Sequence, residues 1–446
     1  MEAESFLSLL DNDYMSIKND LIDLINIPSV STDLNTVKGA LEWYINKAKS
    51  YGLNGQIVCD GTVGVIEVGQ GTETVGVLVH LDVVDAGNLE LWHTDPFSGI
   101  ETDDWIIGRG SIDDKGPAVM VLAILKCLKE SGVSLHKKIQ LIVGTQEEVA
   151  WTDMDQYVKQ FKLPDYGFTP DGEFPILNQE KGYADYILEF KAKDSEPVVV
   201  ESIASGKSLN SIPDYAKCTL KNGVSIDAVG KSTHSSTPEN GINAIETLTS
   251  KILPLIHSDN YVKRCLTFIE FYLKEDFYGK KIGILPSDDN FNQLNPIEDT
   301  TIAATKLECD RHSCKLYLNL RTRIDTIQDI LESKLNRESQ KLEYTLNCLQ
   351  YLAPLDLKSD APYLQKMASA YESQTQLKND FLLANGTSYA KAMPNFVAWG
   401  PLFPGDEDSC HEANERISKS TLRKATRVYG HFIFDVATST ESYKPK

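Results

Sequence analysis

Residues 137–151 read KKIQLIVGTQEEVAW, an apolar run that ends in two adjacent carboxylates, Glu147 and Glu148. The run has the length and composition of a buried strand. Two like charges side by side at the end of a core strand are costly unless a cation lies near them. Residues 144–151 contain no Lys or Arg that could pair with them. The cation that the pair faces must therefore come from elsewhere.

The sequence before this stretch alternates between strand and helix patterns. Apolar strand candidates are 55–59, 63–69 and 75–84, and 137–144 continues the series. Helical periodicity runs over 36–52, and a second helix is expected from Pro117, a favoured first-turn residue, to a stop before Gly132. Continuous apolar strands that alternate with helices indicate an α/β fold with a mixed, mostly parallel sheet covered by helices on both faces.

The pattern changes after residue 183 and returns after 351. Residues 184–351 are more polar, with alternating strands such as 314–323 and helices such as 325–335. We interpret 184–351 as an inserted α+β lid domain. The catalytic domain is then discontinuous, formed by 1–183 and 352–446, and it is closed by a strand near 395–400 and a last amphipathic helix.

Composition excludes several classes of protein. The formal net charge of −20 over 446 residues argues against a nucleic-acid binder. The longest apolar run is too short to span a bilayer, and the start of the chain lacks the pattern of a signal peptide. Eight cysteines are scattered without a CxxC pair, which indicates neither a disulfide framework nor a zinc ribbon. A cytoplasmic location is the simplest expectation.

Histidines and carboxylates follow the predicted strands and loops at one expected edge of the sheet, where ligands collect in open α/β sheets. They come from five separate connections: His80 and Asp82, Asp113 and Asp114, Glu147 and Glu148, Asp171, and His411. Imidazole and carboxylate are standard zinc ligands. The set exceeds what one tetrahedral ion needs, so a pair of metals bridged by a carboxylate is favoured. Two dications also offset the charge of Glu147 and Glu148.

Each of these signals has a simpler explanation when it is taken alone. Asp113 or Asp114 fits the cap of the following helix. A Glu-Glu pair is usually a solvated surface feature, and a single His after a strand is more often only hydrogen-bonded. The order of the motifs and their common setting favour the metal site.

The motifs resemble those of the dinuclear zinc metallopeptidase family that includes aminoacylase, carboxypeptidase G and the PepV-type dipeptidases. The segments that carry the resemblance occur in the family's order: HLDVVDAG (80–87), WHTDPFSG (92–99), GRGSIDDKGP (108–117), GTQEEVAW (144–151), TPDGEFP (169–175), GKSTHSSTPENGINA (230–244) and CHEANE (410–415). The long insert and the stretch 390–405 look closest to PepV-type members.

The resemblance implies a metal-ligand set. His80, Asp113 and Asp171 bind one zinc, and Asp113, Glu148 and His411 bind the other, with manganese or cobalt as possible substitutes. It also implies a cis peptide bond between Asp113 and Asp114. Spacing alone does not distinguish the roles of Glu147 and Glu148. If their segment is extended, the two side chains point to opposite faces.

The resemblance implies further roles around these metals. Glu147 is the general base that acts on a water held between the metals, Asp82 orients the His80 ring, and His234 of the insert stabilises the oxyanion. The expected substrate-binding residues are Asn210, Arg321 and Gly386.

The expected function is zinc-dependent hydrolysis of the peptide bond of small peptides, most simply dipeptides. An amidase for N-acyl amino acids, like aminoacylase or a desuccinylase, is the alternative. A silent binding protein is a rival of another class, which loss of the base or of a ligand would favour, and every one of these residues is present. We expect a small peptide as the partner, no nucleic acid, no membrane, and a monomer rather than a homodimer.

Overall fold

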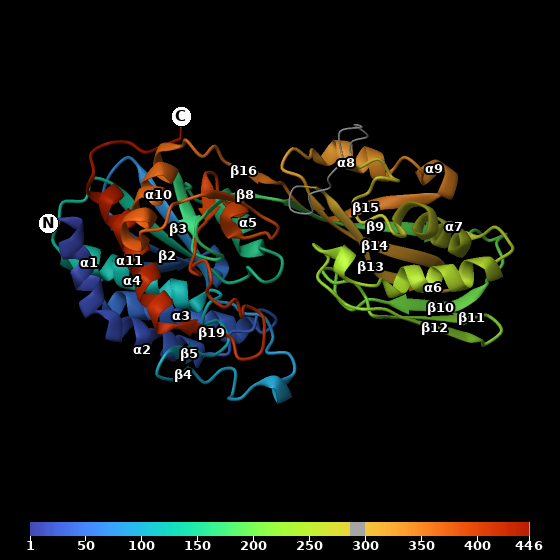
Figure 1. The fold of residues 1–446 in the computed structure, drawn as a ribbon, viewed down its shortest axis with the longest axis horizontal. Coiled ribbons are helices and arrows are strands. Elements are labelled where there is room, and N and C mark those ends of the chain that lie inside the picture. Colours follow the sequence, from blue (N-terminus) through green and yellow to red (C-terminus); the bar gives the residue numbers. More distant parts are fainter. Residues whose placement is uncertain (286–298, 446) are drawn as a thin grey trace. The chain divides into compact units, whose positions relative to one another are not determined.

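The chain, seen here as a computed structural model, is described over residues 1–285 and 299–445 and divides into two compact units (Figure 1). The first unit comprises 1–178, 357–382 and 388–446, and the second comprises 179–356 and 383–387. The sequence analysis expected the borders of the insert at 183/184 and 351/352 instead.

A mixed sheet forms the centre of the first unit. In the described residues its strands run in the order β1-β2-β6-β3-β7-β18-β8-β16, with β17 paired to β8. Their bounds are β1 (Asn54–Val58), β2 (Val63–Gly69), β3 (Thr74–His80), β6 (Lys138–Gly144), β7 (Tyr166–Thr169), β8 (Ile176–Glu180), β16 (Leu355–Asp356), β17 (Phe381–Ala384) and β18 (Phe396–Ala398). The central strands β6, β3, β7 and β18 are parallel, and the flanking pairs are antiparallel.

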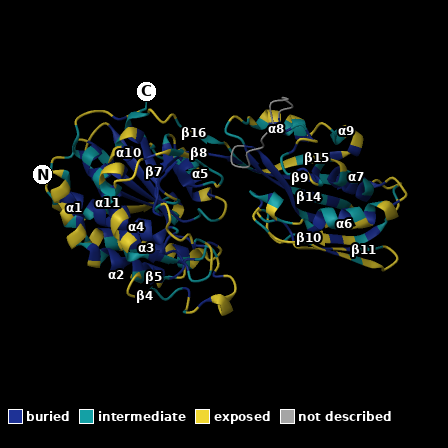
Figure 2. Ribbon diagram, viewed as in Figure 1, coloured by how far each residue is buried: buried dark blue, intermediate teal, exposed yellow. Residues whose placement is uncertain are grey.

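Helices cover this sheet and carry apolar side chains against it. They are α1 (Ala3–Asn12), α2 (Tyr14–Ile25), α3 (Leu34–Ser50), α4 (Lys115–Glu130), α5 (Thr152–Gln160), α10 (Pro362–Thr375) and α11 (Lys419–Thr438). Figure 2 shows the strands buried at the centre and the exposed residues on the outer faces of the helices. Helix α4 is buried along nearly its whole length, because the sheet lies on one side of it and α11 and α2 pack on the others.

A small sheet of β19 (Arg416–Ser418), β5 (Trp105–Ile107) and β4 (Ile100–Glu101) lies beside the loops of the first unit. Short single-turn helices complete the chain: η1 (Cys59–Gly61), η2 (Leu89–Leu91), η3 (Pro238–Asn240), η4 (Leu253–Leu255), η5 (Ile269–Leu273) and η6 (Tyr389–Ala392).

The second unit is an antiparallel sheet with helices on one face. Within the described residues its strand order is β12-β11-β10-β13-β14-β9-β15. The strands are β12 (Ser225–Val229), β11 (Tyr215–Leu220), β10 (Val200–Ser205), β13 (Thr301–Cys309), β14 (Ser313–Thr322), β9 (Gly182–Lys191) and β15 (Tyr344–Leu352). Helices α6 (Ala244–Ile252) and α7 (Tyr261–Phe268) lie along one face, and α8 (Gln328–Leu335) and α9 (Ser339–Leu342) complete the unit (Figure 1).

The expected fold class is confirmed: a helix-covered, mixed sheet with parallel central strands, interrupted by an α+β insert. Two details differ from the sequence expectation. Helix α4 begins at Lys115 instead of Pro117, so the proline occupies the third position, where its missing N–H still has no intrahelical partner. Strand β3 ends at His80 instead of continuing to residue 84.

One cysteine pair was not expected from the spacing. Cys309 and Cys314 face each other across the antiparallel strands β13 and β14 and form a disulfide. The pairing follows from the register of the hairpin, which the sequence alone does not reveal.

Within residues 1–285 and 299–445, none of the helices combines the length and the apolar character that crossing a membrane requires.

Candidate metal centre

The carboxyl ends of the parallel strands bring the expected polar residues together. His80 is the last residue of β3, the two glutamates follow β6 in a turn, and Asp171 follows β7. His411 comes from the long connection between β18 and β19. Because parallel strands all end at one edge of the sheet, these four connections converge on one place.

The first of two groups consists of Asp113, Glu148 and His411, whose ligand atoms lie within 4.8 Å of one another. His411 Nε2 lies 2.9 Å from Asp113 Oδ2 and 3.0 Å from Glu148 Oε1. The Asp113 and Glu148 side chains are 12% and 8% exposed, whereas His411 is 52% exposed. The group is therefore open to solvent on the histidine side only.

The second group consists of His80, Glu147 and Asp171, within the same 4.8 Å limit. His80 Nε2 also lies 2.9 Å from Asp113 Oδ1 and 3.7 Å from Asp171 Oδ2. His80 Nε2 and Asp113 Oδ1 are both buried, and neither has a hydrogen-bond partner. Two buried polar atoms that lie close without a hydrogen bond between them fit two ligands of one cation.

The two oxygens of Asp113 divide between the groups. Oδ1 faces His80 and Oδ2 faces His411. The peptide bond between Asp113 and Asp114 is cis, as the resemblance implied. A carboxylate with one oxygen in each group has the placement that a bridge between two metals needs.

The two glutamates lie in a turn and not in an extended segment. The N–H groups of Val149 and Trp151 both donate to the Gln146 carbonyl. The expectation that alternation along a strand separates the two side chains is therefore wrong. The turn separates them instead, sending Glu148 to one group and Glu147 to the other.

Asp82 is completely buried and holds this turn. Its carboxylate accepts the backbone N–H groups of Glu147 and Glu148, both at 3.2 Å, and the Ser31 hydroxyl at 2.8 Å. The His80 ring is oriented mainly by another atom of the same residue: Nδ1 lies 2.9 Å from the Asp82 backbone carbonyl and 3.5 Å from its carboxylate. Asp82 thus fixes both the histidine and the glutamate turn.

The carboxylates of the centre lie beside two histidines, His80 and His411. Burial raises the pKa of Glu148, and Asp113 adds to this, so that it reaches about 7. Burial lowers the pKa of His411, but Asp113 and Glu148 raise it by more, so that it reaches about 11. His80 is likewise raised well above its usual pKa by its carboxylate neighbours, despite the opposing effect of burial. These carboxylates draw positive charge to the site, as a cation-binding cluster does.

Two supporting residues were missed by the sequence analysis. Glu415 is fully buried, pairs with Arg109 at 2.7 Å, and accepts the backbone N–H groups of Gly110, Ile112 and Asp113. It therefore holds the loop that presents Asp113. Its position four residues after His411 was the available signal, but a glutamate in a polar loop is indistinguishable from a solvated one without the fold.

The other predicted residues belong to the second unit. His234 lies in the loop after β12, Arg321 on β14, Asn210 in the loop before β11, and Gly386 in the segment 383–387. The Asn210 carbonyl accepts the Ser235 N–H at 2.9 Å, so Asn210 and His234 lie in paired loops. The structure places these residues within their own unit only.

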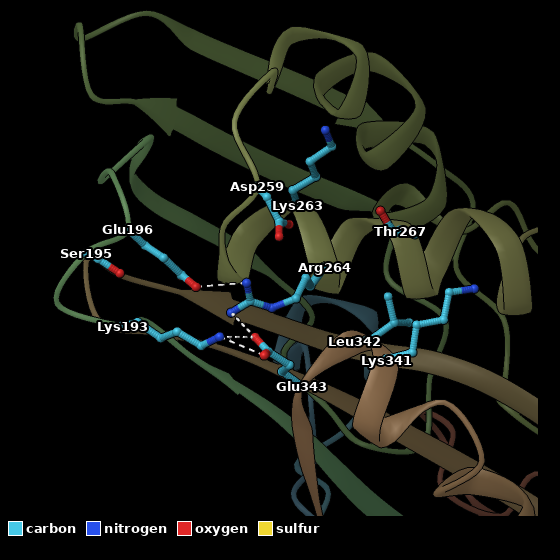
Figure 3. A pocket seen from close by; sticks show the side chains of 10 residues that line it. All are labelled: Lys193, Ser195, Glu196, Asp259, Lys263, Arg264, Thr267, Lys341, Leu342 and Glu343. Carbon is cyan, nitrogen blue, oxygen red and sulfur yellow. Dashed lines mark hydrogen bonds and ion pairs between the residues drawn. The ribbon is translucent and has the colours of Figure 1, made fainter.

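A polar pocket of about 510 Å³ lies in the second unit, away from all predicted site residues (Figure 3). Its charges are largely paired: Arg264 lies 2.8 Å from Glu196 and 3.5 Å from Glu343, which also pairs with Lys193. These ion pairs join the loop after β9 to α7 and to Glu343, the residue that follows α9. The pocket is a structural network and contains none of the metal-binding groups.

Comparison with known proteins agrees with this geometry. Residues 76–435 match the profile of peptidase family M20/M25/M40, and the chain belongs to that family of metallopeptidases. The "Putative dipeptidase YtjP" of Bacillus subtilis is 31% identical over 409 residues, which cover 85% of this chain and 86% of that protein. The "Putative dipeptidase SSP1012" of Staphylococcus saprophyticus is 31% identical over 455 residues, covering 93% and 95%.

Solved structures share the fold at low identity. The di-peptidase Dug1p of Saccharomyces cerevisiae matches with a TM-score of 0.63 and 14% identity, covering 99% of both chains. Human carnosine dipeptidase 1 matches with a TM-score of 0.63 and 14% identity, covering 98% of this chain and 99% of that one. The predicted membership in the metallopeptidase family is confirmed.

Proposed function

We propose that this metallopeptidase is a dipeptidase that hydrolyses the peptide bond of free dipeptides with two zinc ions. The observation that carries the proposal is Asp113, whose two carboxylate oxygens face two separate histidines. The names of the relatives support the dipeptide as substrate.

The two groups fit a pair of metals by their donor chemistry. Asp113, Glu148 and His411 would hold one ion, and His80, Asp171 and Asp113 would hold the other. All donors are imidazole nitrogen or carboxylate oxygen, which zinc accepts and for which manganese and cobalt are substitutes. When bound, the ions act as Lewis acids toward the scissile carbonyl and lower the pKa of water.

Glu147 is the general base in this proposal. Its carboxylate takes a proton from the attacking water and delivers it to the leaving amine. Glu147 also falls within ligand distance of His80 and Asp171, so a ligand role competes with the role of base. The turn held by Asp82 keeps it beside the reacting carbonyl in either role.

The second unit supplies recognition. The Ser236 N–H donates to His234 Nδ1 at 3.2 Å, and a neutral ring that accepts this bond carries its proton on Nε2. Nε2–H then donates to the developing oxyanion, while Arg321 binds the substrate's terminal carboxylate in a two-pronged contact, beside Asn210 and Gly386. Both roles require that His234 and Arg321 reach the substrate that the metal centre holds.

Turnover of a matched panel tests the proposal. Free dipeptides, N-acetyl amino acids and N-succinyl amino acids are incubated with the purified protein, with a chelator, and with zinc, manganese or cobalt added back. We expect cleavage of dipeptides that the chelator abolishes and a metal restores. Cleavage of the N-acyl substrates alone would assign the amidase function instead, and the absence of all turnover with two bound metals would overturn both.

A cytoplasmic location and a monomeric state complete the proposal. Six of the eight cysteines are free thiols, which suits a reducing compartment, whereas the Cys309–Cys314 disulfide does not favour one. Cell fractionation and sedimentation of the purified protein check these two points.

A further inference from the structure

Two cross-strand pairs of polar residues lie side by side on one face of the second unit's sheet. Asn319 of β14 is directly opposite Asp185 of β9, and Arg321 is directly opposite Tyr183. Side chains two residues apart on a strand point to the same face. The intervening residues of both strands point into the apolar core on the other face. The four polar side chains therefore form one patch.

A chain of hydrogen bonds connects this patch to the loop of His234. The Ser235 hydroxyl donates to Asn319 Oδ1 at 2.7 Å, and Asn319 Nδ2 donates to Asp185 Oδ1 at 2.8 Å. The Tyr183 hydroxyl donates to the other oxygen of Asp185. Ser235, Asn319 and Asp185 are at most 4% exposed. Buried polar groups that are linked in this way hold one geometry, because breaking any bond leaves a buried group unsatisfied.

Arg321 lies at the far end of this chain and keeps one donor, Nε, without a partner. It is 5% exposed, and its guanidinium stacks on the Tyr183 ring at 4.6 Å. The buried Nε of Arg321 has no hydrogen-bond partner. Asp185 contributes negative charge nearby without occupying the guanidinium. A buried arginine with a donor that lacks a partner is suited to a negatively charged ligand.

The near end of the chain fixes His234. Ser235, the next residue, is held by its hydroxyl on Asn319 and by its backbone N–H on the Asn210 carbonyl. The backbone of His234 pairs with that of Ser211. A path of four side chains, of which Ser235, Asn319 and Asp185 are buried, therefore runs from the histidine loop to the arginine.

We propose that Asn319, Asp185 and Tyr183 are positioning residues that set the spacing between His234 and Arg321. The spacing selects substrates in which the scissile carbonyl and the terminal carboxylate are one residue apart, as in a dipeptide. This inference rests on the proposed function, since it takes His234 as the oxyanion donor and Arg321 as the carboxylate ligand. The inference adds the residues that fix the positions of His234 and Arg321 relative to each other.

Coupling between variants tests the proposal. Asn319→Leu removes both links of the asparagine at similar volume, and we expect kcat/KM for a dipeptide to fall by about 100-fold, since a displacement of about 1 Å is enough for such a loss. In the double variant Arg321→Ala, His234→Ala, the same change should lower kcat/KM less than about threefold, because the two side chains that Asn319 positions are already gone. An equal loss in both backgrounds would show a purely structural role and overturn the proposal.

Tyr183→Phe is the milder variant if Asn319→Leu fails to fold. It keeps the ring beneath Arg321 and removes only the hydroxyl bond to Asp185, so we expect KM to rise for a dipeptide and to change little for the corresponding dipeptide amide. Tyr317→Phe is the matched control: it lies on β14, two residues before Asn319, and its hydroxyl bonds Glu308 at 3.0 Å. An equal effect of both tyrosine variants would contradict the inference.

The measurement separates this inference from the proposed function. If the wild-type protein cleaves N-acyl amino acids and not dipeptides, the dipeptidase function fails, and the coupling is measured on the N-acyl substrate, which also ends in a carboxylate. Metal content should be unchanged in every variant, because both metal-binding groups lie in the first unit.

Discussion

At the scale of single residues, the fold sends two neighbours in sequence to different groups. Glu147 and Glu148 differ by one position, yet the turn sends them to different groups. The charges alone predicted that cations must face the pair. They could not say which carboxylate binds and which transfers a proton, because that depends on the path of the turn.

Glu147→Ala and Glu148→Ala should therefore behave differently. We expect Glu147→Ala to retain both metals and lose about 10²–10⁴-fold in kcat, the usual contribution of a positioned base. Glu148→Ala should lose one metal, because it removes a ligand of the Asp113 group. Elemental analysis and turnover of both purified variants decide the matter. One metal lost in Glu147→Ala, with two kept in Glu148→Ala, would exchange the two assignments.

Two glutamates of the second unit should show opposite pH dependence. Burial raises the pKa of Glu246 to about 7. The charge of Glu275 also raises this pKa, whereas the hydrogen bond from the Glu275 backbone N–H to the Glu246 carboxylate lowers it. A raised pKa means that the folded protein is most stable below the unfolded value of 4.5 and loses stability as the pH rises to about 7. Glu246→Gln should therefore increase the free energy of unfolding by about 1–3 kcal/mol at pH 8 and by little at pH 4.5.

Glu270 is the matched control with the reverse sign. Burial raises its pKa, but Lys274 at 2.7 Å and Ser250 at 2.9 Å lower it by more. Its contribution is present above the unfolded pKa and disappears on acidification, so Glu270→Gln should cost up to about 1 kcal/mol at pH 8 and less at pH 4.5. Denaturant titrations at both pH values, followed by circular dichroism, measure this. The same sign for both variants would contradict the assignment.

At the scale of elements, the sequence pattern within a segment predicted the helix or strand that the segment forms. The periodicity of 36–52 predicted α3, and the apolar runs predicted β2 and β6 nearly residue for residue, because each signal lies within one element. The Cys309–Cys314 bond and the role of Glu415 depend on register and on contacts between distant segments. No pattern within either segment encodes them.

The loop that carries Asp113 should depend on Glu415. Glu415→Gln leaves the buried charge of Arg109 unpaired and weakens three backbone contacts, so we expect a loss of about 3–5 kcal/mol in the free energy of unfolding and weaker metal retention. Glu407→Gln is the control, since Glu407 is 51% exposed and pairs with Arg416 at the surface; it should change stability by less than about 1 kcal/mol. Similar losses in both variants would mean that Glu415 does not hold the loop of Asp113. Adding Arg109→Met to Glu415→Gln should recover part of the loss, because it removes the unpaired charge.

At the scale of the whole molecule, the candidate metal centre and the proposed recognition residues lie in different units. Both candidate metal groups of histidine and carboxylate lie in the first unit, whereas Arg321 and the hydrogen-bonded chain beside it lie in the second. Each unit has its own apolar core. Removal of metal should therefore act on the stability of one unit and not directly on the other.

The tryptophans allow this to be measured. All five, Trp43, Trp92, Trp105, Trp151 and Trp399, belong to the first unit, so their fluorescence reports its unfolding alone, while circular dichroism also follows the second unit. A ligand at about 100 times its dissociation constant stabilises the folded state by about 2.7 kcal/mol. For a unit of this size, chelation should lower the fluorescence-detected Tm by roughly 5–10 °C.

After chelation, the second unit should unfold at the same midpoint as before. The first unit should unfold at a lower temperature, because the carboxylates of the metal centre repel one another once the cations are gone. Added zinc should restore the midpoint of the first unit. Asp113→Asn should lower the fluorescence-detected Tm and remove most of the response to chelator, since it weakens the ligand that faces both histidines. Elemental analysis confirms that the metal has left. An unchanged fluorescence transition in metal-free protein would mean that these side chains hold no ion that matters to the fold, and a parallel shift of both transitions would mean that the two units unfold as one.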